Sequence, residues 1–168
     1  NFINEEFRYI KPLKRKFIYD IFYNKKYIRK INNKLSTNVF ESDFPIEHRI
    51  YPSKSLGMQW HTDAMLYKSP QYECIFTISN NTNSVTRWKD HLGKLHEIWT
   101  EPNSLLIVKA KGYKHCVTPT EIGEREILKL VYTQTDIVNK NYFEEMNRFK
   151  KRKTKRTKRR TKRRTKRR

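Results

Sequence analysis

The sequence predicts a mainly β domain, either a sandwich or a jelly roll, with flanking helices and a basic tail. Apolar residues recur at helical spacing near the start, and short strand-like runs separated by turn residues fill the middle. Residues 150–168 contain only Lys, Arg and Thr. The length of 168 residues corresponds to about one domain. We therefore expect a helical support over residues 1–35, a β domain over residues 36–149, and a disordered polybasic tail over residues 150–168.

The N-terminal segment, residues 5–34, predicts helices. Its apolar side chains recur at spacings of three, four and one, with basic residues between them: Phe7, Ile10, Leu13, Phe17, Ile21 and Phe22. Pro12 is expected to divide the segment into a short and a longer helix, because proline removes a backbone donor and clashes with the preceding turn. Amphipathic helices of this kind usually pack on a neighbouring layer, so we expect them to support the β domain.

The middle of the chain predicts short strands. Runs rich in β-branched and aromatic residues cover residues 46–51, 58–63, 72–79, 84–89, 95–100, 104–110 and 126–133. Turn residues such as Pro52-Ser53, Asn80-Asn81 and Leu92-Gly93 separate them. Strands and helices do not alternate, so an antiparallel sandwich or jelly roll is favoured over a parallel sheet. A last short helix, over about residues 139–149, is expected to lead into the tail.

Positive charge is concentrated in the tail. The chain carries a net charge of +21, and residues 150–168 hold 15 basic side chains and no acidic one. The first 149 residues are therefore only mildly basic, at about +6. A segment without apolar side chains has nothing to offset the entropy cost of ordering, so we expect it to be disordered alone. Its composition fits polyanion or nucleic-acid binding, nuclear import, or mimicry of a basic substrate.

Cysteine content and hydropathy bear on the compartment. Cys74 and Cys116 form no short-spaced pair, so neither a structural zinc site nor a disulfide framework is indicated, and isolated thiols fit a reducing compartment. The longest apolar run, residues 105–108, is far too short to cross a bilayer. We expect an intracellular protein without a membrane span, cytoplasmic or nuclear. The first residue is Asn, so a preceding signal would not be visible.

Three residues form a candidate metal site: His61, Asp63 and His115. His61 and Asp63 are two residues apart in the predicted strand 58–63, so their side chains should project from one face. A His-x-Asp motif alone is short enough to arise by chance as a polar pair at a strand end. His115, which follows the predicted strand 104–110, adds a third ligand. Two imidazoles and one carboxylate make the facial triad of non-haem iron(II) oxygenases, which leaves three coordination positions open.

The residues after His115 have a characteristic spacing. Pro119 stands at plus four, Gly123 at plus eight and Arg125 at plus ten. With the three candidate ligands, this spacing resembles the prolyl 4-hydroxylase-like branch of the iron(II)/2-oxoglutarate dioxygenases, over about residues 46–133. The resemblance implies a double-stranded β-helix core, iron(II) and 2-oxoglutarate as cofactors, and ascorbate as a candidate reductant. It also implies hydroxylation of a C–H bond with release of succinate and CO2, most simply on a prolyl residue of a protein or peptide.

The resemblance also assigns cofactor-binding residues. Arg125 is implied to bind the distal carboxylate of 2-oxoglutarate, a task that suits a guanidinium because it donates two parallel hydrogen bonds and stays charged when partly buried. Tyr51 stands ten residues before His61, where relatives often carry an aromatic residue. It is a second candidate for the same pocket, and simple core packing is the alternative.

Lys129 departs from the pattern of the relatives, which commonly carry a small polar residue there. If Arg125 points inward, alternation along the strand places Ile127 and Lys129 on its face. A second cation there would assist the cofactor carboxylate or bind an acidic substrate, or it would lie in water at the rim of the barrel. The same alternation directs three residues toward the helix layer: Leu128, Leu130 and Tyr132.

Two other functions compete with a prolyl hydroxylase-like enzyme. Oxidative demethylases of nucleic acid resemble this sequence in the triad, and the net charge of +21 makes them attractive. They typically place the cofactor arginine farther from the distal histidine, so the spacing of Arg125 argues against them. The second is a non-catalytic jelly-roll module that binds polyanions through residues 150–168. The complete ligand set together with Arg125 argues against this alternative.

Deletion of residues 150–168 tests whether the tail and the predicted active site act independently. We expect the deletion to remove most affinity for DNA, RNA or other polyanions at low salt, because the tail would bind by counterion release. Turnover of 2-oxoglutarate with a small substrate should stay close to that of the full chain, since the predicted site needs nothing after Phe149. Nucleic-acid affinity and turnover measured at two salt concentrations check both statements. Unchanged polyanion binding would show that the β domain has a basic binding surface of its own.

Overall fold

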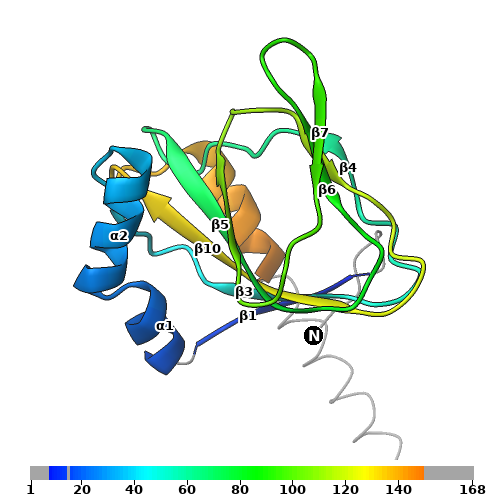
Figure 1. The fold of residues 1–168 in the computed structure, drawn as a ribbon. Helices are drawn as coiled ribbons and strands as arrows, with labels where there is room; N and C mark the ends of the chain where they lie inside the picture. The colour runs from blue at the N-terminus through cyan, green and yellow to red at the C-terminus, as the bar shows by residue number, and fades with distance from the viewer. Residues whose placement is uncertain (1–7, 15, 150–168) are drawn as a thin grey trace, which may run out of the picture.

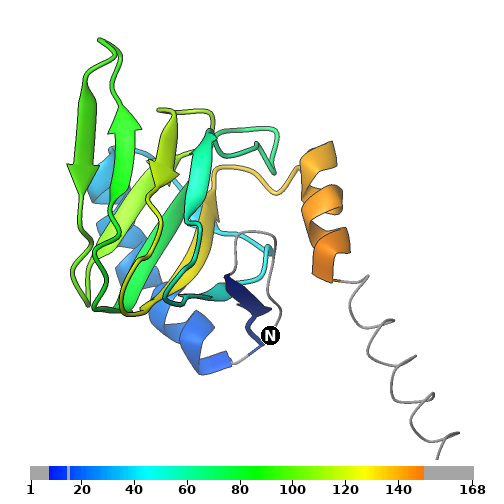
Figure 2. The same ribbon diagram turned by 90° about the vertical axis from the view of Figure 1, so that its right-hand side faces the viewer.

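The body of the protein is a pair of antiparallel β-sheets with helices on one outer face (Figures 1 and 2). The computed structural model describes residues 8–14 and 16–149. This architecture confirms the predicted mainly β fold with flanking helices. The predicted tail over residues 150–168 lies outside the described residues, as do residues 1–7 of the predicted N-terminal helix.

The first sheet, sheet A, has the order β1-β3-β10-β5-β8, and β2 also pairs with β10. Its strands are β1 (Tyr9–Pro12), β2 (Phe40–Glu41), β3 (Glu47–Tyr51), β5 (Gln71–Asn80), β8 (Leu105–Lys109) and β10 (Arg125–Thr133). The second sheet, sheet B, has the order β4-β9-β6-β7. Its strands are β4 (Met58–His61), β6 (Thr86–Lys89), β7 (Leu95–Ile98) and β9 (His115–Val117).

Each of the seven predicted strands overlaps an observed one, and three observed strands were not predicted. β2 and β9 are only two and three residues long, too short to show a pattern of alternation. β1 was predicted as helix, which is wrong for Tyr9–Pro12. These residues pair with β3 along the edge of sheet A. Pro12 is tolerated there because an edge strand leaves part of its backbone unpaired.

The helices begin later than predicted and are divided at a different residue. α1 covers Lys16–Phe22 and α2 covers Lys25–Leu35. The division falls at Asn24 rather than at Pro12, because the Asn24 side chain accepts the Tyr27 backbone N–H at 2.8 Å and caps α2.

The helix layer covers the outer face of sheet A, as predicted. Leu128, Leu130 and Tyr132 of β10 form a buried core with residues from both helices, including Phe22 and Ile31. The Tyr132 hydroxyl donates to the carbonyl oxygen of Phe22 at 2.7 Å. Alternation along β10 then directs the intervening side chains to the opposite face, between the sheets. One face of β10 therefore packs on the supporting helices, and the other face points toward the candidate site.

The predicted last helix is present over residues 140–149 and lies to one side of the sheets (Figure 2). Tyr142 packs in a second buried cluster with Phe44 and Tyr67. The hydroxyls of Tyr67 and Tyr142 donate to the two oxygens of Asp43, at 2.5 and 2.8 Å. These contacts anchor the segment beside the β-sheets. Within the described residues, no helix combines the length and apolar character needed to span a bilayer.

Candidate metal centre

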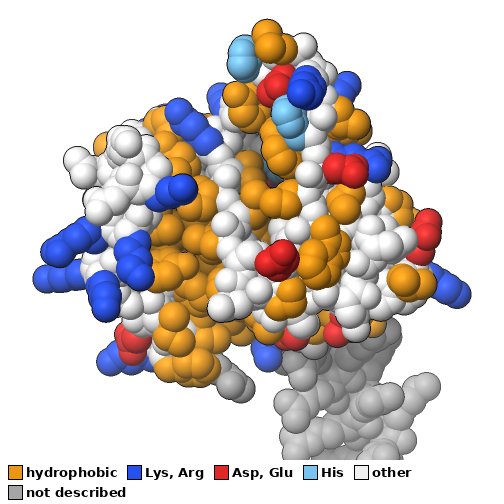
Figure 3. Space-filling view, viewed as in Figure 1, with side chains coloured by type: hydrophobic (Ala, Val, Ile, Leu, Met, Phe, Trp, Pro, Cys, Tyr) orange, Lys and Arg blue, Asp and Glu red, His pale blue; other side chains and the backbone are white. Residues whose placement is uncertain are grey.

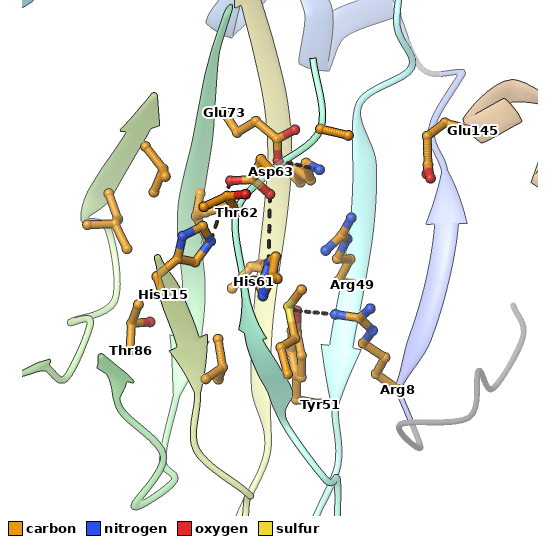
Figure 4. Close-up of a pocket in the computed structure, with 18 of the residues that line it drawn as sticks. Arg8, Arg49, Tyr51, His61, Thr62, Asp63, Glu73, Thr86, His115 and Glu145 are labelled. Atoms are coloured by element: carbon orange, nitrogen blue, oxygen red, sulfur yellow. Dashed lines mark hydrogen bonds and ion pairs between the residues drawn. The ribbon is translucent and has the colours of Figure 1, made fainter. Parts of the chain in front are cut away.

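A cavity of about 210 Å³ lies between the two sheets and contains the candidate ligands (Figure 4). Its apolar lining comes from both sheets and includes Ile75, Leu106, Val108, Val117 and Ile127. All six predicted site residues line it: Tyr51, His61, Asp63, His115, Arg125 and Lys129. The fold therefore brings together residues from positions 51 to 129 in a single pocket.

His61 and His115 are partners across neighbouring strands. His61 is the last residue of β4 and His115 the first of β9, and the two lie opposite each other in the register. Their ring centroids are 4.4 Å apart. Gly57 precedes β4 with a φ of +69°, and a Cβ at this position would lie 2.2 Å from the carbonyl oxygen of Val117. Only glycine therefore allows the chain to enter β4 so close to β9.

Asp63 reaches the histidines from a loop, which corrects the prediction that it shares a strand with His61. β4 ends at His61, and the Asp63 backbone carbonyl accepts the N–H of Lys111 at 3.1 Å. The Asp63 Oδ1 lies 3.8 Å from the His61 Nε2, and Oδ2 lies 3.4 Å from the His115 Nε2. One potential ligand atom from each of the three residues lies within 4.8 Å of the other two.

Backbone contacts orient both imidazoles for metal binding. The Nδ1 of His61 lies 2.6 Å from the Gln59 carbonyl oxygen, and the Nδ1 of His115 lies 3.0 Å from that of Tyr113. Because a carbonyl only accepts, each Nδ1 donates, and in this tautomer of the neutral imidazole the Nε2 is the atom that can bind a metal. Burial lowers the pKa of His61 below its usual value, although the contact with Gln59 opposes this, so the neutral ring is favoured.

This donor set fits iron(II). The Nε2 of His61 is buried and has no hydrogen-bond partner among the described residues, so a metal ion would satisfy an atom that the protein leaves unpaired. The set contains two imidazoles and one carboxylate without a thiolate, which suits iron(II) and leaves positions open for further ligands.

Arg125 lies in the same cavity and fits an anionic group. It is 3% exposed, and its Nε is a buried donor without a partner in residues 8–14 and 16–149. Its Cζ lies 5.9 Å from the ring centroid of Tyr51, which faces it across β3 and β10. Burial lowers the pKa of Arg125, because the charged form is poorly solvated there. A carboxylate that entered the pocket would supply the counterion.

Comparisons with solved structures identify the fold. An oxidoreductase of the 2OG-Fe(II) oxygenase family from Burkholderia pseudomallei aligns with a TM-score of 0.67 and 12% identity, over 79% of this chain and 71% of that one. A prolyl-4-hydroxylase from Pseudomonas putida aligns with a TM-score of 0.58 and 14% identity, over 77% and 70%. The chain has the fold of the 2OG-Fe(II) oxygenases.

A second solved prolyl hydroxylase has the same fold. A Trichoplax adhaerens prolyl hydroxylase, in complex with a hypoxia inducible factor oxygen degradation domain peptide fragment, aligns with a TM-score of 0.56 and 16% identity. This alignment covers 74% of this chain and 62% of that one. No protein-family model and no curated protein sequence matches the chain.

Within this oxygenase fold, Tyr51 lies among arginines. Its hydroxyl accepts from the Arg8 Nη1 at 3.4 Å, and its ring is 2% exposed. Burial by itself would raise the pKa of Tyr51, but Arg49, Arg8 and Arg125 outweigh it and bring this pKa below the usual value. The sequence analysis did not identify Arg49, although alternation along the predicted strand places it on the same face as Tyr51. This end of the cavity therefore favours a negatively charged occupant.

Lys129 lies inside the cavity, not in water at its rim. Its Nζ forms an ion pair with Glu73, and the two side chains are 13% and 5% exposed. Burial raises the pKa of Glu73, and Lys129 opposes this effect. Burial also disfavours ionisation of Glu47, but Arg49 and Lys129 outweigh it and lower that pKa. Lys129 therefore has acidic partners in the protein, whereas Arg125 has none among the described residues.

Proposed function

We propose that the protein is an iron(II)- and 2-oxoglutarate-dependent dioxygenase that hydroxylates a C–H bond, with a prolyl residue of a peptide as its substrate. One observation carries the proposal: a single cavity holds a preoriented His-Asp-His set and a buried arginine without a carboxylate partner among the described residues. These are the two kinds of group that a metal-chelating dicarboxylate requires. The shared fold with known oxygenases adds independent support.

The proposed roles follow from the contacts. His61, Asp63 and His115 would hold iron(II) through two Nε2 atoms and a carboxylate oxygen. Arg125 would bind the distal carboxylate of 2-oxoglutarate, with Tyr51 packed against its guanidinium. Bound iron(II) would supply the oxidation, in which 2-oxoglutarate, dioxygen and the substrate C–H bond give succinate, CO2 and the alcohol.

The apolar part of the cavity lining would limit the access of water. Ile75, Leu106, Val108 and Ile127 present apolar side chains between the two sheets. A cofactor carboxylate in such surroundings is less screened than in water, so its attraction to Arg125 is strengthened. We assign Lys129 a positioning role, because its ion pair with Glu73 holds β10 and β5 together beside Asp63.

A peptide substrate is favoured over a methylated base by two independent features. The plus-ten spacing of Arg125 after His115 resembles prolyl hydroxylases. One of the solved proteins with this fold is a prolyl hydroxylase that contains a bound peptide fragment. Oxidation of nucleic acid remains the alternative that an experiment must exclude.

A substrate panel tests the proposal directly. With iron(II), 2-oxoglutarate and ascorbate, we expect proline-containing peptides to increase succinate formation several-fold, whereas the same peptides with alanine in place of proline should not. Succinate release and a mass increase of one oxygen on the peptide are the measurements. Stimulation by methylated DNA or RNA, with release of formaldehyde, would assign the enzyme to the demethylases. Absence of any iron-dependent succinate formation would favour a binding module.

A further inference from the structure

Four aromatic rings form a row across sheet B, and the candidate metal ligands are only two of them. His61 on β4 is opposite His115 on β9. His115 is in turn opposite Trp88 on β6, and Trp88 is opposite His96 on β7. Residues directly opposite each other on neighbouring strands project from the same face of a sheet. Trp88 and His96 therefore continue the row of metal ligands, beyond His115.

Trp88 and His96 are held as a stacked pair. Their ring centroids are 5.2 Å apart and the rings are 14° from parallel. The His96 Nε2 lies 2.7 Å from one oxygen of Asp90. The other Asp90 oxygen accepts the backbone N–H groups of Leu92 and Lys94 in the hairpin turn. One carboxylate thus organises both the turn and the histidine ring, so the aromatic pair is ordered before any ligand binds.

The pair lies next to the cavity, on the same face of sheet B as His115. Thr86, two residues before Trp88 on the same face of β6, lines the cavity, whereas Trp88 and His96 lie outside that lining. The β6–β7 hairpin projects beyond the rest of sheet B (Figure 1). Its surface carries histidine and hydrophobic side chains (Figure 3), and the side chain of His96 is 34% exposed. A substrate that extends out of the cavity on the side of His115 would meet this pair.

Positive charge lies at the same end of the molecule. The segment from residue 109 to residue 114, which includes the last residue of β8 and the turn before β9, contains three exposed lysines and no acidic residue. The N–H of Lys111 donates to the Asp63 carbonyl at 3.1 Å, and the Lys114 carbonyl accepts the N–H of Lys89 at 3.1 Å. The segment therefore contacts both a candidate metal ligand and the hairpin. A partner that reaches the pair is expected to carry negative charge.

We propose that Trp88 and His96 form a substrate subsite that binds a proline ring of an acidic, extended peptide. The proposal rests on the proposed function and specifies which peptides the enzyme accepts. Proline-rich segments are already extended and dock on aromatic surfaces at a low entropy cost. Nucleic acid is less well matched, because His96 already covers one face of Trp88, so successive bases cannot stack on both faces of this ring.

Peptide binding to the full chain tests the subsite without turnover. Two labelled acidic peptides, identical except that one has alanine in place of proline, are titrated at about 0.15 M salt. The two peptides carry the same charge, so residues 150–168 should contribute equally to the binding of both. This contribution therefore cancels in the ratio of the two dissociation constants. We expect the proline peptide to bind at least tenfold more tightly to the wild type. Trp88→Ala should abolish this preference, and Trp88→Phe should retain part of it.

Leu95→Ala is the matched control. Leu95 precedes His96 on β7, projects from the opposite face and is 51% exposed, so its removal should leave the preference unchanged. An unchanged melting temperature of Trp88→Ala shows that the fold is retained. A charge test uses Lys111→Gln combined with Lys114→Gln, which should weaken binding of both peptides equally and reduce its dependence on salt.

Three results would overturn the subsite: equal binding of the two peptides by the wild type, a proline preference that survives in Trp88→Ala, or an oligonucleotide that binds more tightly than either peptide and depends on Trp88. Failure of the proposed function has a different signature. A Trp88-dependent preference without succinate formation from any peptide would support the subsite and reject the dioxygenase reaction.

Discussion

Asp63→Ala is expected to abolish iron-dependent 2-oxoglutarate turnover while the protein remains folded. The carboxylate faces both Nε2 atoms, at 3.8 and 3.4 Å, and supplies the only negative charge of the proposed ligand set. Loss of residues that merely orient metal ligands typically costs about 10–100-fold in affinity or activity, so loss of a ligand should cost on the order of 100-fold or more. Iron(II) affinity and succinate formation are the measurements. His61→Ala and His115→Ala should behave in the same way.

Matched variants distinguish metal binding from general damage. Asp136→Ala removes an exposed carboxylate after β10, and His91→Ala removes an exposed imidazole at the hairpin turn. Both should turn over 2-oxoglutarate like the wild type. Full turnover by Asp63→Ala would be incompatible with the assigned triad. Partial turnover calls for a repeat without buffer anions such as formate, because these can replace a carboxylate ligand.

Arg125→Ala is expected to raise the 2-oxoglutarate requirement strongly. Truncation of one partner of a buried, hydrogen-bonded charge pair costs about 2–5 kcal/mol, which corresponds to an increase in Kd of about thirtyfold or more. Arg125→Lys should retain more affinity, because it preserves the charge but loses the bidentate geometry. The Kd of 2-oxoglutarate, measured by calorimetry on the metal-loaded protein, checks the prediction. Normal binding by Arg125→Ala would refute the argument from spacing.

Lys129→Met provides the contrast. Lys129 is paired with the buried Glu73, so its loss should mainly reduce stability, by about 3–5 kcal/mol, as is typical when one partner of a buried pair is removed. Lys129→Met should therefore lower the melting temperature and leave 2-oxoglutarate affinity nearly unchanged. Arg125→Ala should instead lower the affinity and leave the melting temperature nearly unchanged. A large loss of 2-oxoglutarate affinity in Lys129→Met, with an unchanged melting temperature, would move the cofactor role from Arg125 to Lys129.

Local patterns in the sequence determined much of the fold. Runs of β-branched and aromatic residues between turn residues located seven of the strands, because a strand half-buried in a sheet leaves a signal within a few residues. Alternation from Arg125 to Tyr132 also sorted the side chains of β10 correctly into a cavity face and a helix face. The spacing from His115 to Arg125 lies within one stretch of chain, so it was visible without the structure.

Tertiary structure decided what depends on pairing between distant segments. β1 resembles a helix in sequence and becomes a strand only because β3 offers an edge. β9 is too short to recognise alone, yet its pairing with β4 places His115 opposite His61. Asp63 reaches the same point from a loop that Lys111 holds.

The same reason applies to the charges of the cavity. Lys129 and Arg125 are both basic residues on one face of a strand. The spacing from His115 favoured Arg125 as the cofactor residue, but the sequence did not show which of the two has an acidic partner. The fold places Glu73 beside Lys129 and provides no acidic partner for Arg125 among the described residues. Charge compensation is a property of neighbours in space, so it appears only when β5, β3 and β10 lie together. The sequence by itself therefore determined the candidate residues and their order, and the tertiary structure decided which cation is left to bind a ligand.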